Sequence, residues 1–167
     1  MKLICDGDAD LLVTLSLIYG HGAILAKKTP LFGKSSKKIL HPENLSSVFV
    51  NFYTEFSEIS EFLGNLHLTP LEIQYLYVDL NIAKDKDIAH LSALLYSLQQ
   101  FSSIEILCIL SSQMNYVDLW LTFSRYYSRI FQNKKGIVQE LIFGNGGVYF
   151  KEIGQVEDCL LVLCENE

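Results

Sequence analysis

The strongest constraint on the fold is a continuous apolar run at residues 104–112, IEILCILSS. The run has the length of one strand and lacks a polar face, which is typical of a strand covered on both sides in a parallel sheet. Shorter apolar runs at residues 2–5, 23–26 and 47–53 alternate with segments of helical periodicity. We therefore predict an α/β fold, a three-layer sandwich with a mostly parallel central sheet.

Three helices are predicted from apolar residues that recur at helical spacing. The first occupies the apolar residues that follow Asp10, and Gly20 would end it. A second begins near Phe56 and carries an acidic ridge that includes Glu55. A third begins near Asp85 or Asp87 and ends about Gln100, with one leucine- and isoleucine-rich stripe.

Two further helices are expected on other grounds. Thr69-Pro70-Leu71-Glu72 has the form of a capping box, which predicts a helix that carries Ile73, Leu76, Tyr77 and Leu80. Residues 115–133 are expected to form one long packed helix, because Asn115 and Asp118 suit its start and Lys134, Lys135 and Gly136 suit its end.

The last thirty residues change character. IVQELIF and VYFKEI flank GNGG, and Asn-Gly supplies the positive φ angles of a tight turn, so a C-terminal antiparallel β-hairpin is predicted. CLLVLC at residues 159–164 would be a last strand. Neither an internal repeat nor a linker divides the sequence, so residues 1–167 are predicted to form a single α/β domain.

Composition excludes several classes of protein. Half of the 167 residues are hydrophobic, which excludes a disordered chain, and the net charge of −6 argues against a uniformly basic nucleic-acid binder. The four cysteines form no CxxC pair and are expected to be reduced and buried. Because the start is acidic and no apolar stretch approaches the roughly 18 residues of a membrane span, we expect a cytoplasmic protein without membrane contact.

One basic segment interrupts this acidic chain. Five of the thirteen basic residues lie within twelve positions: Lys27, Lys28, Lys34, Lys37 and Lys38. Such a loop is either an ordinary solvated loop or a contact for phosphate or an acidic partner, which keeps nucleic acid possible as a ligand. The glycines of a phosphate-binding loop are missing at the required spacing.

The sequence Asp6-Gly7-Asp8-Ala9-Asp10 gathers three carboxylates directly after the first apolar run. Acids at the carboxyl end of an early strand are placed where α/β folds carry out metal and phosphate chemistry, and two or three such oxygens suffice to hold Mg²⁺. The alternative is a strand-end acid followed by helix-capping acids.

MKLICDGDADLL, VFVNFYTEFSEIS, and DKDIAHLSALLYSL followed by IEILCILSSQMN together resemble PIN-domain nucleases over roughly residues 1–115. The resemblance implies catalytic roles for Asp6, Glu55 and Asp87, metal ligation by Asp6, Asp8 and Asp87, and a Mg²⁺ or Mn²⁺ cofactor that directs water at an RNA phosphodiester. The family's fourth acid is replaced here by Gln113 or Asn115. The opening is also similar to the haloacid-dehalogenase pattern, with Asp6 as nucleophile and Asp8 as acid.

The expected helix 115–133 is unusually rich in aromatic residues. These are too dense for all of them to be core, so a protein partner or homo-oligomer is expected to cover Tyr116, Trp120, Phe123 and Tyr127. Two functional hypotheses follow. The first is a non-catalytic protein-interaction or regulatory module that acts through this aromatic surface and the basic loop, and the alternative is a PIN-like metal-dependent ribonuclease.

Overall fold

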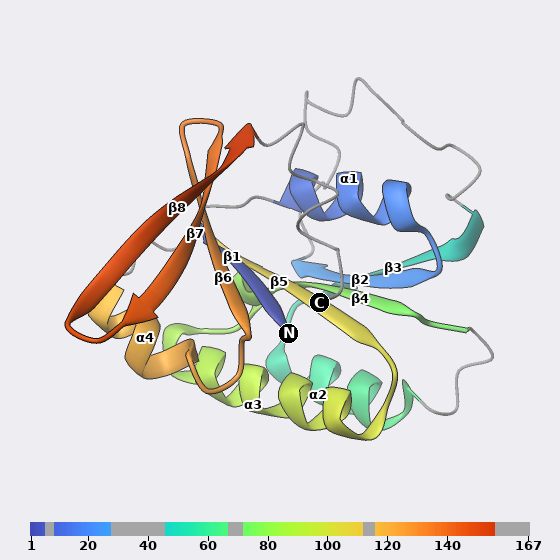
Figure 1. The fold of residues 1–167 in the computed structure, drawn as a ribbon. Helices are drawn as coiled ribbons and strands as arrows, with labels where there is room; N and C mark the ends of the chain where they lie inside the picture. Colours follow the sequence, from blue (N-terminus) through green and yellow to red (C-terminus); the bar gives the residue numbers. More distant parts are fainter. Residues whose placement is uncertain (6–8, 28–45, 67–71, 112–115, 156–167) are drawn as a thin grey trace.

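The computed structural model describes residues 1–5, 9–27, 46–66, 72–111 and 116–155. These residues build one eight-stranded sheet with helices on both faces (Figure 1). The elements are β1 (Lys2–Cys5), α1 (Ala9–Tyr19), β2 (Gly22–Lys27), β3 (Val48–Tyr53), α2 (Phe56–Gly64), β4 (Tyr75–Asp79), the 3₁₀ turn η3 (Leu80–Ile82), α3 (Asp85–Phe101), β5 (Glu105–Leu110), α4 (Tyr116–Phe123), β6 (Arg129–Lys134), β7 (Ile137–Gly144) and β8 (Gly147–Gln155).

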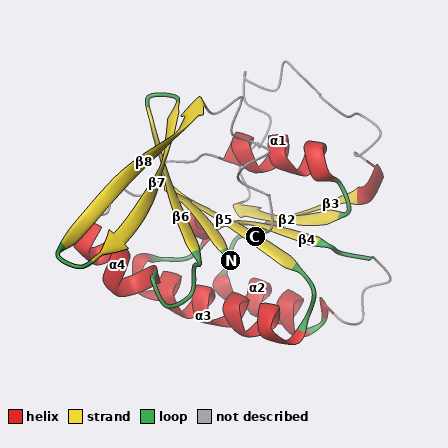
Figure 2. Ribbon diagram, in the orientation of Figure 1, coloured by secondary structure: helices red, strands yellow, loops and turns green. Residues whose placement is uncertain are grey.

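The sheet is mostly parallel. Its strand order is β3-β2-β4-β5-β1-β6-β7-β8, and the first six strands in that order are parallel to one another. β7 and β8 add an antiparallel hairpin beyond β6. Helix α1 covers one face, while α2, α3 and α4 cover the other (Figure 2). The predicted α/β fold with a mostly parallel sheet and a C-terminal hairpin is therefore confirmed.

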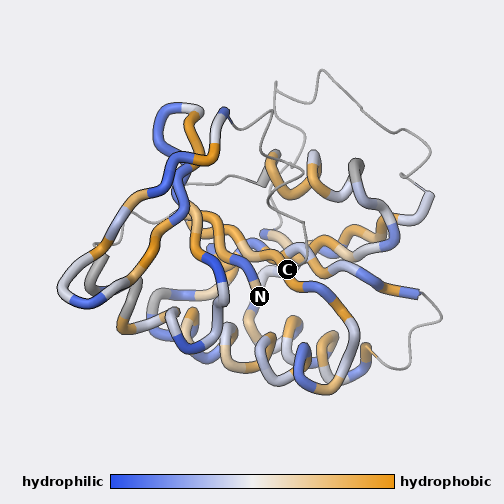
Figure 3. The backbone as a smooth tube through the Cα atoms, in the orientation of Figure 1, coloured by the Kyte–Doolittle hydropathy of each residue, from blue (hydrophilic) through white to orange (hydrophobic). Residues whose placement is uncertain are grey.

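The core consists of two apolar clusters, one on each face of the sheet. Successive residues of β5 belong to alternate clusters: Cys108 packs on the side of α3 and Ile109 on the side of α1. Both side chains are fully buried, as expected for a strand with helices on both faces. In Figure 3 the most apolar backbone accordingly runs through the central strands.

Local sequence signals fix several element boundaries. Helix α1 ends at Tyr19, and Gly20 follows it with a φ of 60°, a conformation that glycine adopts without a side-chain clash. The hairpin turn between β7 and β8 places Gly146 at a φ of 100°. Helix α3 buries Leu91 and Leu95 along the predicted stripe. These three predictions are confirmed.

The prediction of a helix that carries Ile73, Leu76, Tyr77 and Leu80 is wrong. Residues 75–79, YLYVD, form strand β4, which pairs in parallel with β2 on one side and β5 on the other. Leu76 and Val78 face one cluster and Tyr77 the other, so the segment is buried on both faces. The apolar spacing fits either structure, and pairing with two neighbouring strands decides for the strand.

The long helix expected over residues 115–133 is also wrong. Helix α4 ends at Phe123, and residues 129–134 form β6, which pairs in parallel with β1. Ile130 and Phe131 are buried in opposite core clusters, which requires the two-residue repeat of a strand. The chain therefore leaves the helix early and returns to the sheet.

The buried cysteines agree with expectation where the structure describes them. Cys5 and Cys108 are free thiols inside the core. Burial raises the pKa of Cys108 to about 12, so its thiol stays neutral. None of the helices in the described ranges is long and apolar enough to cross a membrane. The predicted capping box at Thr69 and the predicted last strand at residues 159–164 lie outside the described residues.

Candidate functional site

The carboxyl ends of three adjacent strands define the candidate site. In the register of the sheet, Asp79 of β4 lies beside Ile109 of β5, and Leu110 of β5 lies beside Cys5 of β1. The chain leaves β1 toward α1 on one face and leaves β5 toward α4 on the other face (Figure 1). In open α/β sheets, ligands bind at the carboxyl edge where the chain changes direction between neighbouring strands in this way.

A polar network joins the ends of β4 and β5. Asn81 donates to Asp79 Oδ1 through its backbone N–H at 3.0 Å and its Nδ2 at 2.5 Å. Asn81 Oδ1 accepts from the backbone N–H of Ser111 at 3.1 Å and from Ser111 Oγ at 2.8 Å. Asn81 thus bridges the two strand ends and orients both the carboxylate and the hydroxyl.

Asp79 retains an oxygen for a ligand. Its side chain is only 6% exposed, yet both of its hydrogen bonds from described residues go to Oδ1. Oδ2 receives no donor within the described part of the chain. A carboxylate held in place by one oxygen, with the second oxygen unused at the carboxyl edge of a parallel sheet, is suited to bind a cation or to accept a proton.

The acids of the first loop lie outside the described residues. Asp6 and Asp8 belong to residues 6–8, although Asp6 follows Cys5 directly in the sequence and Cys5 ends β1 at this edge. Asp87 lies in the first turn of α3, where its backbone N–H donates to Lys84 O at 2.7 Å, and its side chain is half-buried.

Glu55 has a structural role in the described chain. It is the N-cap of α2 and forms a capping box with Glu58, whose Oε2 also accepts from the backbone N–H of Thr54 at 2.8 Å. Glu55 follows β3, and three strands separate β3 from β1. Four inter-strand spacings amount to about 19 Å. The topology therefore sets Glu55 apart from the end of β1, where the resemblance to PIN domains would need both groups together.

In the ranges that the structure describes, no three His, Cys, Asp or Glu side chains gather closely enough to hold an ion. Because residues 6–8 lie outside these ranges, ligation by Asp6 and Asp8 stays a prediction.

The predicted aromatic surface can be compared with the structure at two of its four residues, and both contradict it. Phe123 is fully buried and Tyr127 is 4% exposed, so these two side chains belong to the core and not to a partner-binding surface. Tyr127 OH lies 2.9 Å from Ser92 Oγ. The side chains of Tyr116 and Trp120 lie outside the described part of the chain. The expectation failed for Phe123 and Tyr127 because both side chains pack into the core cluster that α3 covers.

The basic loop is described only at its start. Lys27 ends β2 with an exposed side chain, while the other four residues of the loop lie outside the described residues: Lys28, Lys34, Lys37 and Lys38. Lys27 is at the carboxyl end of its strand, on the same edge of the sheet as Asp79. A basic contribution to this edge by the rest of the loop stays a prediction.

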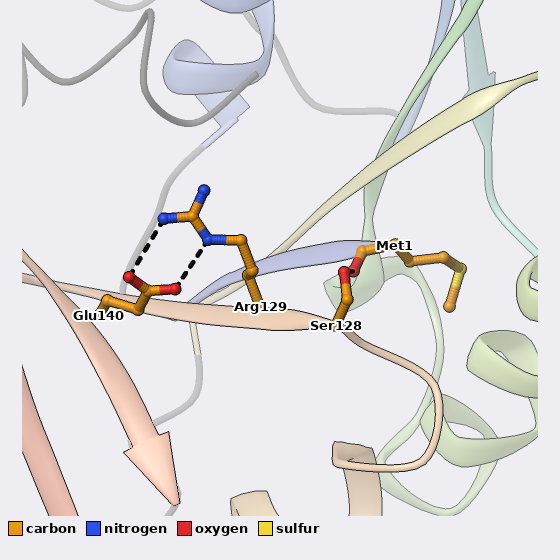
Figure 4. Close-up of polar contacts among 4 residues, drawn as sticks. All are labelled: Met1, Ser128, Arg129 and Glu140. Atoms are coloured by element: carbon orange, nitrogen blue, oxygen red, sulfur yellow. Dashed lines mark hydrogen bonds and ion pairs between the residues drawn. The ribbon is translucent and has the colours of Figure 1, made fainter. Parts of the chain in front are cut away.

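Another polar cluster holds β6 in place on the far side of β1. Arg129 forms a bidentate salt bridge with Glu140 of β7: Nε donates to Oε1 at 2.7 Å and Nη2 donates to Oε2 at 3.1 Å (Figure 4). Ser128 donates to Met1 O through its backbone N–H at 2.9 Å and its Oγ at 3.1 Å. The first contact ties β6 to β7, and the second ties the start of β6 to the start of β1.

Asp79 and Asn81 are the site residues that sequence reasoning missed. The sequence predicted a helix for this segment, and an aspartate inside a helix is not recognised as the acidic end of a strand. A signal was present, however: Leu76-Tyr77-Val78-Asp79 repeats the pattern of Leu3-Ile4-Cys5-Asp6, an apolar run that ends in aspartate.

A scan against models of known protein families found no match for this chain, and a search of curated proteins found no relative.

Proposed function

We propose that the carboxyl edge of β4, β5 and β1 binds a divalent metal ion and cleaves phosphodiesters. The observation that carries this proposal is the buried Asp79, which is held through Oδ1, receives no donor at Oδ2 from the described residues, and ends a strand two positions from β1. Asp6 follows β1 in the sequence. Mg²⁺ is commonly held by one or two carboxylates together with substrate phosphates, so Asp6 and Asp79, at the ends of the two strands that flank β5, would suffice from the protein.

The chemistry follows from the charge of such an ion. A divalent cation held by carboxylates polarises a phosphoryl oxygen and lowers the pKa of a bound water toward neutrality. Ser111 donates both its backbone N–H and its hydroxyl to Asn81 Oδ1, so its role would be to hold Asn81, and through Asn81 the carboxylate of Asp79, in place beside the ion. Lys27 at the end of β2 adds a positive charge along the same edge.

The proposed ligand set differs from the set that the PIN resemblance implies. Asp79 takes the place of Glu55, while Asp6, Asp8 and Asp87 are retained. Glu55 is excluded because it caps α2 and because three strands intervene between β3 and β1. RNA as the substrate continues to rest on the resemblance alone.

The test is a thermal melt with and without millimolar Mn²⁺ in the wild type and in three conservative variants, Asp6→Asn, Asp79→Asn and Glu55→Gln. A metal ion that binds only the folded state raises the melting temperature by mass action. We expect this rise in the wild type and in Glu55→Gln, and its loss in Asp6→Asn and Asp79→Asn. Cleavage of single-stranded RNA should follow the same pattern.

Two other outcomes would contradict the proposed metal site or its ligand set. If Glu55→Gln abolishes the metal effect, the PIN-like acid set is right and the set with Asp79 is wrong. If Mn²⁺ does not stabilise the wild type, the metal site is refuted. Asn81 donates to Oδ1 whether residue 79 is Asp or Asn, so Asp79→Asn should retain the fold without metal.

A second candidate function is the non-catalytic interaction module. It is favoured by large apolar side chains that the described surface exposes: Leu121 of α4 at 57%, Tyr149 of β8 at 58% and Phe52 of β3 at 42%. These side chains do not form one patch, since β3 and β8 are opposite edges of the sheet. They also differ from the predicted surface, in which Phe123 and Tyr127 are buried. Absence of any metal effect, together with self-association or binding of a protein partner, would favour the module over the enzyme.

A further inference from the structure

The two edges of the sheet differ in how they are protected. At one edge, β8 carries Lys151 and Glu152 and pairs with β7 through a register shift near Val138. Charges and irregular pairing are common devices that prevent edge strands from joining other chains. At the other edge, β3 has the sequence VFVNFY, which contains neither charge nor proline, and it pairs regularly with β2 over six residues.

Strand β3 also exposes apolar side chains on both of its faces. Phe49 is 44% exposed on the side of α2, while Val50 and Phe52 are 39% and 42% exposed on the side of α1. Among the described residues, β2 is the single strand that pairs with β3. A long, uncharged and apolar edge of this kind is a template for another strand.

Asn51 lies at the centre of this strand and carries an unsatisfied donor. Its Nδ2 is buried and has no hydrogen-bond partner among the described residues. Leaving such an amide unpaired destabilises the monomer. The residue as a whole is half-buried, so a reorientation of the amide toward the open edge of β3 would let a strand beside β3 accept a hydrogen bond from Nδ2.

We propose that β3 pairs antiparallel with β3 of a second copy of this chain, about a twofold axis through Asn51. A twofold axis perpendicular to the sheet keeps each face continuous, so a residue can lie opposite only a residue of its own face. Centred on Asn51, this register sets Val50 opposite Phe52 of the second copy, and Phe49 opposite Tyr53. The exposed apolar side chains then cover one another, and the two Asn51 amides meet as mutual donor and acceptor.

Other registers match less well. Centring the axis on Val50 would set Phe49 opposite Asn51, which places an apolar ring against each unsatisfied amide. The uncharged sequence of β3 favours a second copy as the partner, because pairing a strand with itself places like charges together wherever charges occur. The proposal is independent of the metal site, which lies at the carboxyl ends of other strands.

The first test is the mass of the full-length chain by sedimentation over a wide range of concentration. We expect a monomer that converts to a dimer as concentration rises. Val50→Lys places a charge between the two β3 strands and should abolish the dimer. The circular dichroism spectrum and the melting temperature of the monomer should stay unchanged. The matched control is Ile142→Lys, which alters a side chain of similar exposure on β7 and should dimerise like the wild type.

Cysteine cross-linking tests the register separately. Asn51→Cys should form a disulfide between two copies under mild oxidation, since directly opposed Cα atoms lie about 4.5–5.5 Å apart. Phe49→Cys should not, because residues 49 of the two copies would be about 13 Å apart along the strands. A monomer at every concentration, a dimer that survives Val50→Lys, or cross-linking at residue 49 and not at 51 would overturn the proposal.

Discussion

Ser92 of α3 and Tyr127, in the turn between α4 and β6, place their hydroxyl oxygens 2.9 Å apart inside the core. Both residues are almost completely buried, at 0% and 4% exposure. The contact ties the helical layer to the segment that leads into β6, and it explains why Tyr127 is not available to a partner. The hydroxyl of Tyr127 also interacts with the thiol of Cys108 in β5.

We expect Tyr127→Phe to lower the free energy of unfolding by about 1–2 kcal/mol, because it leaves the Ser92 hydroxyl buried without its partner. Ser92→Ala should cost a similar amount. The double variant should cost less than the two single changes together, since neither unpaired hydroxyl remains. Urea denaturation of the four proteins measures the coupling, and strictly additive losses would show that the contact is not formed.

Gly22 should not tolerate a side chain. A Cβ at this position would lie 2.7 Å from Cε2 of Tyr77 and 2.8 Å from the backbone oxygen of Tyr75. Both atoms belong to or adjoin the packed centre of the sheet, so we expect Gly22→Ala to destabilise the protein by about 1–3 kcal/mol. Thermal or urea denaturation is the measurement.

The control for this prediction is Gly64→Ala at the end of α2, where a Cβ would meet no atom within 4 Å. Alanine also restricts the unfolded chain more than glycine does, so this variant should be neutral or more stable by up to about 1 kcal/mol. Equal losses in both variants would contradict the packing argument at Gly22.

Alkaline pH should destabilise the fold through Cys108. Burial, opposed by the hydrogen bond from Tyr127, raises the pKa of the thiol from its ordinary value of 9.0 to about 12. The folded state thus retains a proton that the unfolded state releases. The contribution to stability is fully present below pH 9 and is lost as the pH rises from 9 to 12. Burial also raises the pKa of Tyr127, which adds in the same direction above pH 10.

Melting temperatures measured from pH 7 to pH 11 test this linkage in the wild type and in Cys108→Ala. We expect the variant to have a lower melting temperature at neutral pH, because the substitution leaves a small cavity. Its melting temperature should fall less than that of the wild type between pH 7 and pH 11. Parallel curves for the two proteins would show that Cys108 does not titrate within this range.

Several elements could be predicted from local sequence. Residues 106–110 are apolar at every position, which is typical of a strand covered on both sides, and Asn145-Gly146 specifies a tight hairpin turn. Helix α3 has a regular stripe and forms as predicted. Each of these signals acts within the segment itself, so knowledge of the neighbours in the fold was not needed.

The candidate site was predictable only in part. Local sequence places Asp6 after an apolar run, and the end of β1 does lie at the carboxyl edge of the sheet. The second acid of the proposed site differs from the predicted one, however: Glu55 caps α2 beyond β3, whereas Asp79 ends β4 at the carboxyl edge of the sheet. The order of strands in a sheet depends on contacts between distant segments, which no local pattern contains.

The sequence by itself determined the class of fold, the position of most helices and strands, and the antiparallel hairpin, because apolar periodicity and turn residues act over a few positions. The tertiary structure alone decided that residues 75–79 and 129–134 are strands. Their spacing of apolar residues suits a helix as well, and pairing with β2, β5 and β1 resolves the ambiguity by satisfying backbone groups and burying both faces. Tertiary packing also decided that Phe123 and Tyr127 belong to the core, and that Asp79 and Ser111 meet through Asn81.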